Sequence, residues 1–113
     1  MKVNLLTKSI DIKIYQSLIK QLNKDLILGG IDLKIKETEL PKDLVLKLTN
    51  LVKNLIQNHY QTFSQFLYTL DVSEKKIQAL TETNLEKLIP QIVKLILERL
   101  LQKVILKSQF KNM

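Results

Sequence analysis

The sequence has no cysteine, and glycine and proline occur only twice each among its 113 residues. Without cysteine the chain can form neither a disulfide framework nor a thiolate zinc site, and it has no cysteine nucleophile. Because His59 is the only histidine, a metal site built from several imidazoles is excluded as well. The shortage of glycine and proline favours long uninterrupted elements over a fold rich in loops.

Long hydrophobic runs are also missing. No stretch approaches the roughly 20 apolar residues that span a membrane, and the N-terminus has no apolar run long enough for a signal peptide. We therefore expect a cytoplasmic protein without a transmembrane segment. Hydrophobic residues nevertheless make up 45% of the chain, which is enough for one core at this length. The expected organisation is a single helical domain over residues 1–113.

Apolar residues recur at helical spacing in two long segments of the first 70 residues. The first segment predicts a helix from about Asp11 to Leu28, capped by Ser9 or Asp11 and stopped by the glycine pair that follows. The second segment covers residues 41–70 and begins with Pro41, which suits a first helical turn. It is compatible with one long helix or with two helices that meet near Asn58.

Residues 31–36 alternate strictly between apolar and charged side chains. This pattern is typical of a strand, but no partner strand follows, and a lone strand leaves its backbone groups unpaired. We therefore expect an extended connector near residues 31–40 that lays Ile31, Leu33 and Ile35 across the helices. The predicted fold class is all-α: a compact bundle of four or five helices.

The last third of the chain predicts a short helix, capped by Ser73 or Asp71, and then a long one. Thr83 and Glu86 have the spacing of a capping box, which marks the start of the long helix. We expect this helix to end near residue 108. Pro90 either kinks it after one turn or marks its true start.

One segment resembles a known group of sequences. Residues 66–76 are Phe-Leu-Tyr-Thr-Leu-Asp-Val-Ser-Glu-Lys-Lys, and Leu-Glu-Arg follows at residues 97–99. This combination resembles a group of short uncharacterised bacterial proteins with a similar Tyr-x-x-Asp-Val-Ser-Glu segment before the final helix. The resemblance covers the C-terminal half. It implies a helical domain and no particular chemistry.

No catalytic constellation is visible. The neighbours of His59 in the chain include no carboxylate that could orient it as a general base, so it is more typical of a packing or helix-end residue. Several carboxylates stand at helix starts, where the helix dipole accounts for them. No glycine-rich phosphate loop or serine nucleophile elbow is present. We expect no enzymatic activity, no cofactor, no metal and no small-molecule substrate.

The final helix is apolar on more than one face. A fully central helix is hard to arrange in a chain of this size, so the second face suggests a partner chain. The leading hypothesis is a protein–protein interaction or self-association module. Its interface would use Leu97, Leu101 and Ile105 as anchors, with Arg99 and Lys103 at the rim.

The net charge of +7 is concentrated in the two ends of the chain. Residues 1–30 contain five lysines and two aspartates, and residues 91–113 hold four lysines, one arginine and one glutamate. On the last helix four cations recur every four residues, a spacing at which like charges need compensation. The helix dipole and solvent can supply it, or an anionic partner can. The alternative function is therefore a nucleic-acid-binding protein that uses both basic ends. The four cations are Arg99, Lys103, Lys107 and Lys111.

Overall fold

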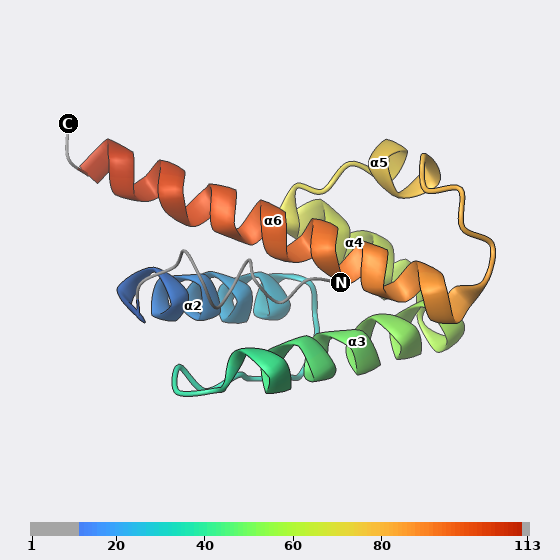
Figure 1. Cartoon of the computed structure of the whole chain (residues 1–113), viewed down its shortest axis with the longest axis horizontal. Coiled ribbons are helices and arrows are strands. Elements are labelled where there is room, and N and C mark those ends of the chain that lie inside the picture. The colour runs from blue at the N-terminus through green and yellow to red at the C-terminus, as the bar shows by residue number, and fades with distance from the viewer. Residues whose placement is uncertain (1–11, 112–113) are drawn as a thin grey trace.

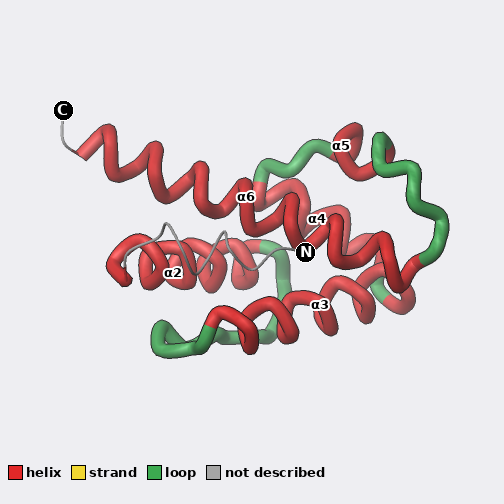
Figure 2. The backbone as a smooth tube through the Cα atoms, in the orientation of Figure 1, coloured by secondary structure: helices red, strands yellow, loops and turns green. Residues whose placement is uncertain are grey.

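The computed structural model describes the backbone of residues 12–111 and the side chains of residues 12–108. Within this range the chain forms five helices and no strand, which confirms the all-α fold class (Figures 1 and 2). The predicted N-caps of the first helix lie outside the described residues. The helices are α2 (Ile12–Leu28), α3 (Pro41–Asn58), α4 (Tyr60–Leu70), α5 (Glu74–Gln78) and α6 (Leu85–Lys111).

Helix α6 is the central element of the bundle. Helices α2, α3 and α4 all pack against it, and α2 runs antiparallel to it along its C-terminal half (Figure 1). Buried apolar residues follow almost its whole length, which explains why its sequence is apolar on more than one face. We expected a central helix to be hard to arrange in a chain of this size, yet α6 occupies that position. Its buried residues are Ile89, Ile92, Val93, Ile96, Leu97, Leu100 and Val104.

Residues 41–70 form two helices, as one of the two alternatives predicted. Pro41 occupies the first turn of α3, where its missing N–H costs no hydrogen bond, and Asp43 complements the helix dipole there. The break falls at His59, whose φ of −144° and ψ of 59° are not helical. Its N–H donates to the Leu55 carbonyl at 2.9 Å and its carbonyl accepts from the Phe63 N–H at 3.0 Å. His59 is thus an exposed helix-end residue.

The connector after α2 has the predicted alternation, with Ile35 buried and its charged neighbours Lys34 and Lys36 exposed. The turn that starts it depends on two glycines. Gly30 adopts a φ of +75°, which residues with a side chain rarely adopt. A Cβ atom on Gly29 would lie 3.3 Å from the Cα atom of Phe66, so a glycine here lets α2 end directly against α4.

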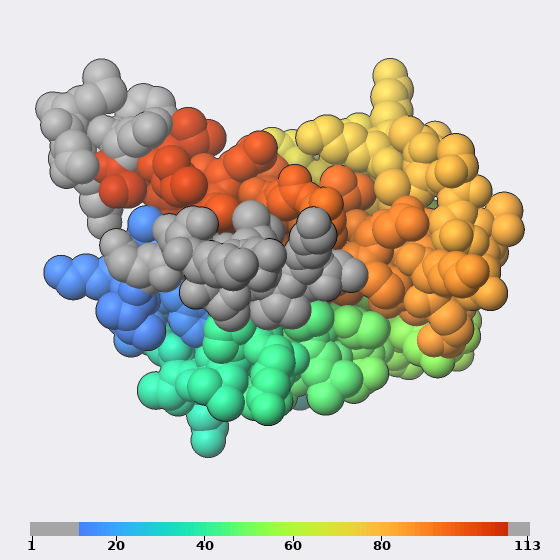
Figure 3. Space-filling view, viewed as in Figure 1, coloured from blue at the N-terminus to red at the C-terminus, as the bar shows by residue number. Residues whose placement is uncertain are grey.

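The segment between α4 and α6 forms a corner of the molecule far from α2 (Figure 3). Ser73 caps α5 by accepting a hydrogen bond from the Lys75 N–H at 3.1 Å, as predicted. The predicted cap of α6 was wrong by one residue. Asn84, not Thr83, accepts from the Glu86 N–H at 2.9 Å, and asparagine is the more favoured of the two residues at an N-cap. Pro90 lies inside α6, so it does not mark the start of the helix.

Candidate functional site

Three cations in the C-terminal half of α6, Arg99, Lys103 and Lys107, have partners within the chain. The Lys103 ammonium donates to Oδ2 of Asp25 at 2.9 Å and to the Thr69 carbonyl at 3.1 Å. Asp25 is only 1% exposed, and its carboxylate also accepts from the side-chain amide of Gln21. A buried carboxylate of this kind requires a cation and hydrogen bonds together, and the site supplies both. Lys103 therefore joins α6 to α2 and α4.

Lys107, one turn further along α6, donates to the side-chain carbonyl of Gln21. Arg99, one turn before Lys103, pairs with Oδ2 of Asp71 at 2.8 Å. Its Nε is buried and has no hydrogen-bond partner among the described residues. Within the described side chains of this row, Arg99 and Lys103 are thus compensated by carboxylates of the same chain, and Lys107 is hydrogen-bonded to a neutral amide. This was neither of the two explanations that the sequence suggested.

Sequence reasoning missed Gln21 and Asp25. Both lie on the apolar face of α2, because Leu18, Gln21, Leu22 and Asp25 follow the spacing of one helical stripe. A polar residue on such a stripe must find a partner inside the fold. The two polar residues within the apolar stripe of α2 were therefore the available signal. Gln21 and Asp25 are four residues apart, and so are Lys107 and Lys103, which bind them from α6.

The five predicted interface residues fall into three environments. Leu97 is fully buried in the chain's own core, so it offers no surface to a partner in this fold. Arg99 and Lys103 form the internal ion pairs described above. Leu101 is half-buried, and Ile105 is 40% exposed. The last two residues thus remain available on the surface of α6.

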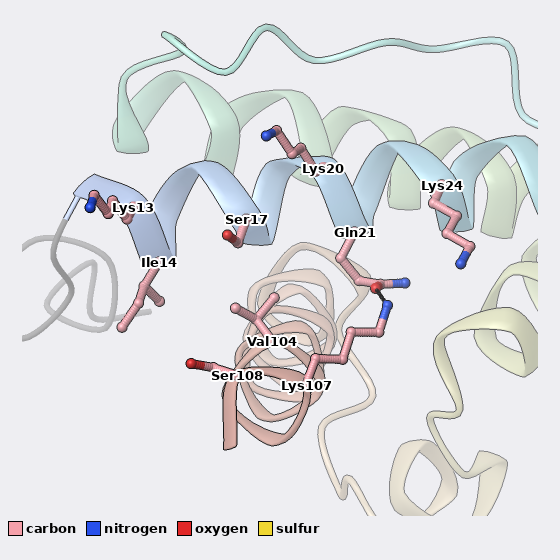
Figure 4. A pocket seen from close by; sticks show the side chains of 9 residues that line it. All are labelled: Lys13, Ile14, Ser17, Lys20, Gln21, Lys24, Val104, Lys107 and Ser108. Carbon is pink, nitrogen blue, oxygen red and sulfur yellow. Dashed lines mark hydrogen bonds between the residues drawn. The ribbon is translucent and has the colours of Figure 1, made fainter. Parts of the chain in front are cut away.

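A surface groove of about 520 Å³ lies between α2 and the C-terminal half of α6 (Figure 4). The apolar side chains of Ile14 and Val104 form its floor, and Figure 4 shows Ser17 and Ser108 beside them. On α6, Leu101 and Ile105 lie on the same helical stripe as Val104 and Ser108, so the apolar surface continues beyond the groove. Lysines surround it: Lys13, Lys20, Lys24 and Lys107.

The groove brings the two basic ends of the sequence together. Three of its lysines come from α2 and one from α6, and no described acidic residue lines it. Lys13 and Lys24 form no ion pair with a described residue, and Lys20 is 3.8 Å from an exposed glutamate, Glu37. Exposed ion pairs of this kind contribute little. The groove therefore presents positive charge around an apolar floor.

The described part of the chain, residues 12–111, meets the requirements of neither a metal site nor a membrane-spanning helix. These residues contain no group of three or more histidine, aspartate or glutamate side chains that could hold a metal ion. None of their helices is both long and apolar enough to cross a membrane. His59 has an exposed side chain at a helix junction, next to Asn58 and Tyr60.

No family model, curated protein or solved structure matches the chain at a significant level. The candidate site therefore depends on its geometry alone.

Proposed function

We propose that the protein is a non-enzymatic interaction module that binds an acidic segment of a partner protein in the α2–α6 groove. The observation that carries this proposal is the convergence of Lys13, Lys20, Lys24 and Lys107 around one apolar floor. An amphipathic partner helix with an apolar face and acidic flanks has the complementary chemistry. The half-buried Leu101 and the exposed Ile105 extend the apolar surface that such a helix would cover.

Nucleic acid fits this groove less well. Lysines can contact phosphates, but no arginine and no aromatic side chain is among the described residues that line the groove. Arginine provides bidentate contacts to bases and phosphates, and aromatic rings provide stacking platforms for unpaired bases. The apolar floor has no role in binding a phosphate backbone. Nucleic-acid binding therefore remains the alternative, and the experiment must distinguish it from binding of an acidic protein segment.

The test is affinity purification from lysate of the native host, with and without nuclease, quantified by mass spectrometry. We expect a discrete protein partner that survives nuclease. The variant Lys13→Glu/Lys24→Glu should lose this partner, because it reverses charge at the two groove lysines of α2 that form no ion pair with a described residue. The matched control Lys42→Glu/Lys87→Glu makes the same change in charge at exposed residues outside the groove and should retain the partner.

Three outcomes would count against the proposal. Equal recovery by the groove variant and the control variant would exclude the groove as the binding site. Loss of all partners on nuclease treatment would favour nucleic acid. Recovery of the bait alone, together with a dimer in light scattering, would favour self-association through Leu101 and Ile105.

A further inference from the structure

The cations in the second half of α6 differ in what balances their charge. Arg99 and Lys103 each pair with a carboxylate of the same chain, at 2.8 Å and 2.9 Å respectively. Lys107 follows at the same spacing, but its bond to a described residue goes to the neutral side-chain amide of Gln21. It forms no ion pair with a described carboxylate. The series of ion pairs is therefore short of one carboxylate, at Lys107.

The carboxylate of Asp25 does not fill this position. Its Oδ2 accepts directly from the Lys103 ammonium, and one carboxylate balances the charge of one cation. Both of its oxygens also accept from Nε2 of Gln21 at 3.2 Å, so Gln21 stands between Asp25 and Lys107. The charge of Lys107 is thus left unmatched where this side chain lines the α2–α6 groove.

Gln21 determines where this charge lies. An ionised carboxylate only accepts hydrogen bonds, so the NH₂ group of Gln21 must face Asp25 and its side-chain carbonyl must face another donor. That donor is the Lys107 ammonium, and Figure 4 shows the two side chains meeting beside the groove. Gln21 is only 7% exposed and is bound at both ends of its amide. It therefore holds the ammonium of Lys107 in one place.

The other groove lysines are not held in this way. Lys13 and Lys24 are exposed and have no partner among the described residues, and Lys20 has only its exposed contact with Glu37. A ligand that binds such a lysine must first restrict the rotamers of the side chain, which costs entropy. At Lys107 the fold has already restricted the side chain, so a ligand carboxylate gains more there.

Lys107 can still bind a ligand while it is held. An ammonium group can donate to more than one acceptor, and the described residues accept only one of its hydrogen bonds. The apolar side chain of Val104 lies one turn before it on α6 and lines the same groove. A carboxylate at Lys107 would therefore lie beside apolar surface, where an ion pair is stronger than in open water.

We propose that Lys107 binds one aspartate or glutamate carboxylate of the partner's acidic segment, and that this contact decides which acidic segments the groove accepts. The partner carboxylate completes the row on α6, in the way that Asp71 and Asp25 match the two cations before it. A segment without an acidic residue at this point meets only the exposed lysines of α2 and binds weakly. This inference rests on the function proposed for the groove and assigns its specificity to one residue.

The probe is a blocked peptide made of two repeats of Glu-Ala-Leu-Glu-Ala-Leu-Leu followed by Glu. Its leucines have the spacing of one helical face, and glutamates lie beside them. Binding to the full chain is measured at low ionic strength by fluorescence anisotropy of the labelled peptide. Lys107→Met should weaken binding roughly tenfold, whereas Lys13→Met and Lys24→Met should weaken it roughly twofold or less. Each of the three variants removes one positive charge from the same groove, so the comparison isolates the effect of holding the lysine.

A second comparison changes the peptide. Each glutamate is replaced in turn by glutamine, and every peptide is titrated into the parent protein and into Lys107→Met. One replacement should weaken binding to the parent protein roughly tenfold and leave binding to Lys107→Met unchanged, because that glutamate is the one that Lys107 binds. Circular dichroism should show that Lys107→Met folds, since the partner that it loses is a neutral amide.

Equal weakening by the three lysine variants, with no glutamate coupled to Lys107, would overturn this inference while the groove still bound an acidic peptide. Failure of the parent protein to bind the peptide, or equal binding by Lys13→Glu/Lys24→Glu, would count against the proposed function and the inference together. The glutamine series on the parent protein decides the question even if Lys107→Met does not fold. Equal effects of all the glutamine replacements there would exclude a single carboxylate as the determinant.

Discussion

The two halves of α6 are held in the fold by different interactions. The first half buries apolar side chains, among them Ile92, Ile96 and Leu97, and its start pairs with α3 through Glu86 and Lys53. In the second half Arg99, Lys103 and Lys107, at every fourth position, contact polar groups elsewhere in the chain. The comparison shows that a row of like charges on one helix can join that helix to its neighbours through hydrogen bonds and ion pairs inside the chain.

The difference follows from what each half faces. The first half lies where the neighbouring helices present leucine, valine and phenylalanine. The second half runs along α2, which presents Gln21 and Asp25 within its apolar stripe. Burial of Asp25 is tolerable only with a cation beside it.

The largest effect is expected for Lys103→Met. This change leaves the carboxylate of Asp25 buried and without its cation, and removing one partner of such a pair costs about 3–5 kcal/mol of unfolding free energy. Urea denaturation followed by circular dichroism gives the value.

The control is the double variant Asp25→Leu/Lys103→Met. Replacing both partners by apolar residues should restore most of the lost stability, because no unpaired charge then remains. If the double variant were as unstable as Lys103→Met, the cost would come from packing of the lysine stem and the ion pair would have no special role.

In the first half, Leu97→Ala should cost about 2–5 kcal/mol, since it leaves a cavity in a fully buried position. The matched control is Leu106→Ala on the same helix. Leu106 is 46% exposed, so its truncation should change stability by about 0.5 kcal/mol or less. Equal effects of the two variants in urea denaturation would contradict the assignment of Leu97 to the core.

Alkaline pH tests the contact of Tyr15 on α2 with Glu39 in the connector, which involves no residue of α6. Burial, with the nearby Glu39 and Asp43, raises the pKa of Tyr15 from 10.0 to about 12. The neutral phenol, which donates to the Glu39 carbonyl, is therefore favoured in the native state. Above pH 10 the unfolded chain loses this proton first, so stability should fall as the pH rises towards 12, by up to about 2 kcal/mol.

This effect is measured against Tyr15→Phe, which retains the lysine titrations but lacks the phenol. The parent protein should lose more stability than the variant between pH 10 and 12. Parallel losses would show that the native and unfolded states hold the Tyr15 proton equally well.

The smallest effect is expected for Arg99→Ala, at about 1 kcal/mol or less. The Asp71 side chain that Arg99 binds is 80% exposed, and Arg99 Nε lacks a partner among the described residues. Asp71→Asn is the control, because asparagine also tolerates the left-handed φ of 61° at this position. Thermal unfolding should show similar small losses of stability for both variants. A loss of stability as large as that of Lys103→Met would contradict the expectation that the exposed pair contributes less than the buried one.

Much of the fold could be predicted because its signals are local. Pro41 and Ser73 mark helix starts, and the alternation of residues 31–36 predicts the connector. The cap at Asn84 was missed by one residue because Thr83 and Glu86 also match a capping box. The groove and the ion pairs were not predicted, since they join residues distant in sequence. Nothing near Lys103 indicates that Asp25 lies beside it.

The bond between Lys103 and Asp25 joins residues 78 positions apart in the chain. This long range matters while the chain is being synthesised, because its helices emerge from the ribosome one after another. While the ribosome makes this segment, α2, α3 and α4 emerge before α6, the helix on which all three pack. They have no completed core until it arrives, and contacts of such long range form slowly. The nascent helices must therefore keep their apolar faces from other partners until α6 leaves the exit tunnel.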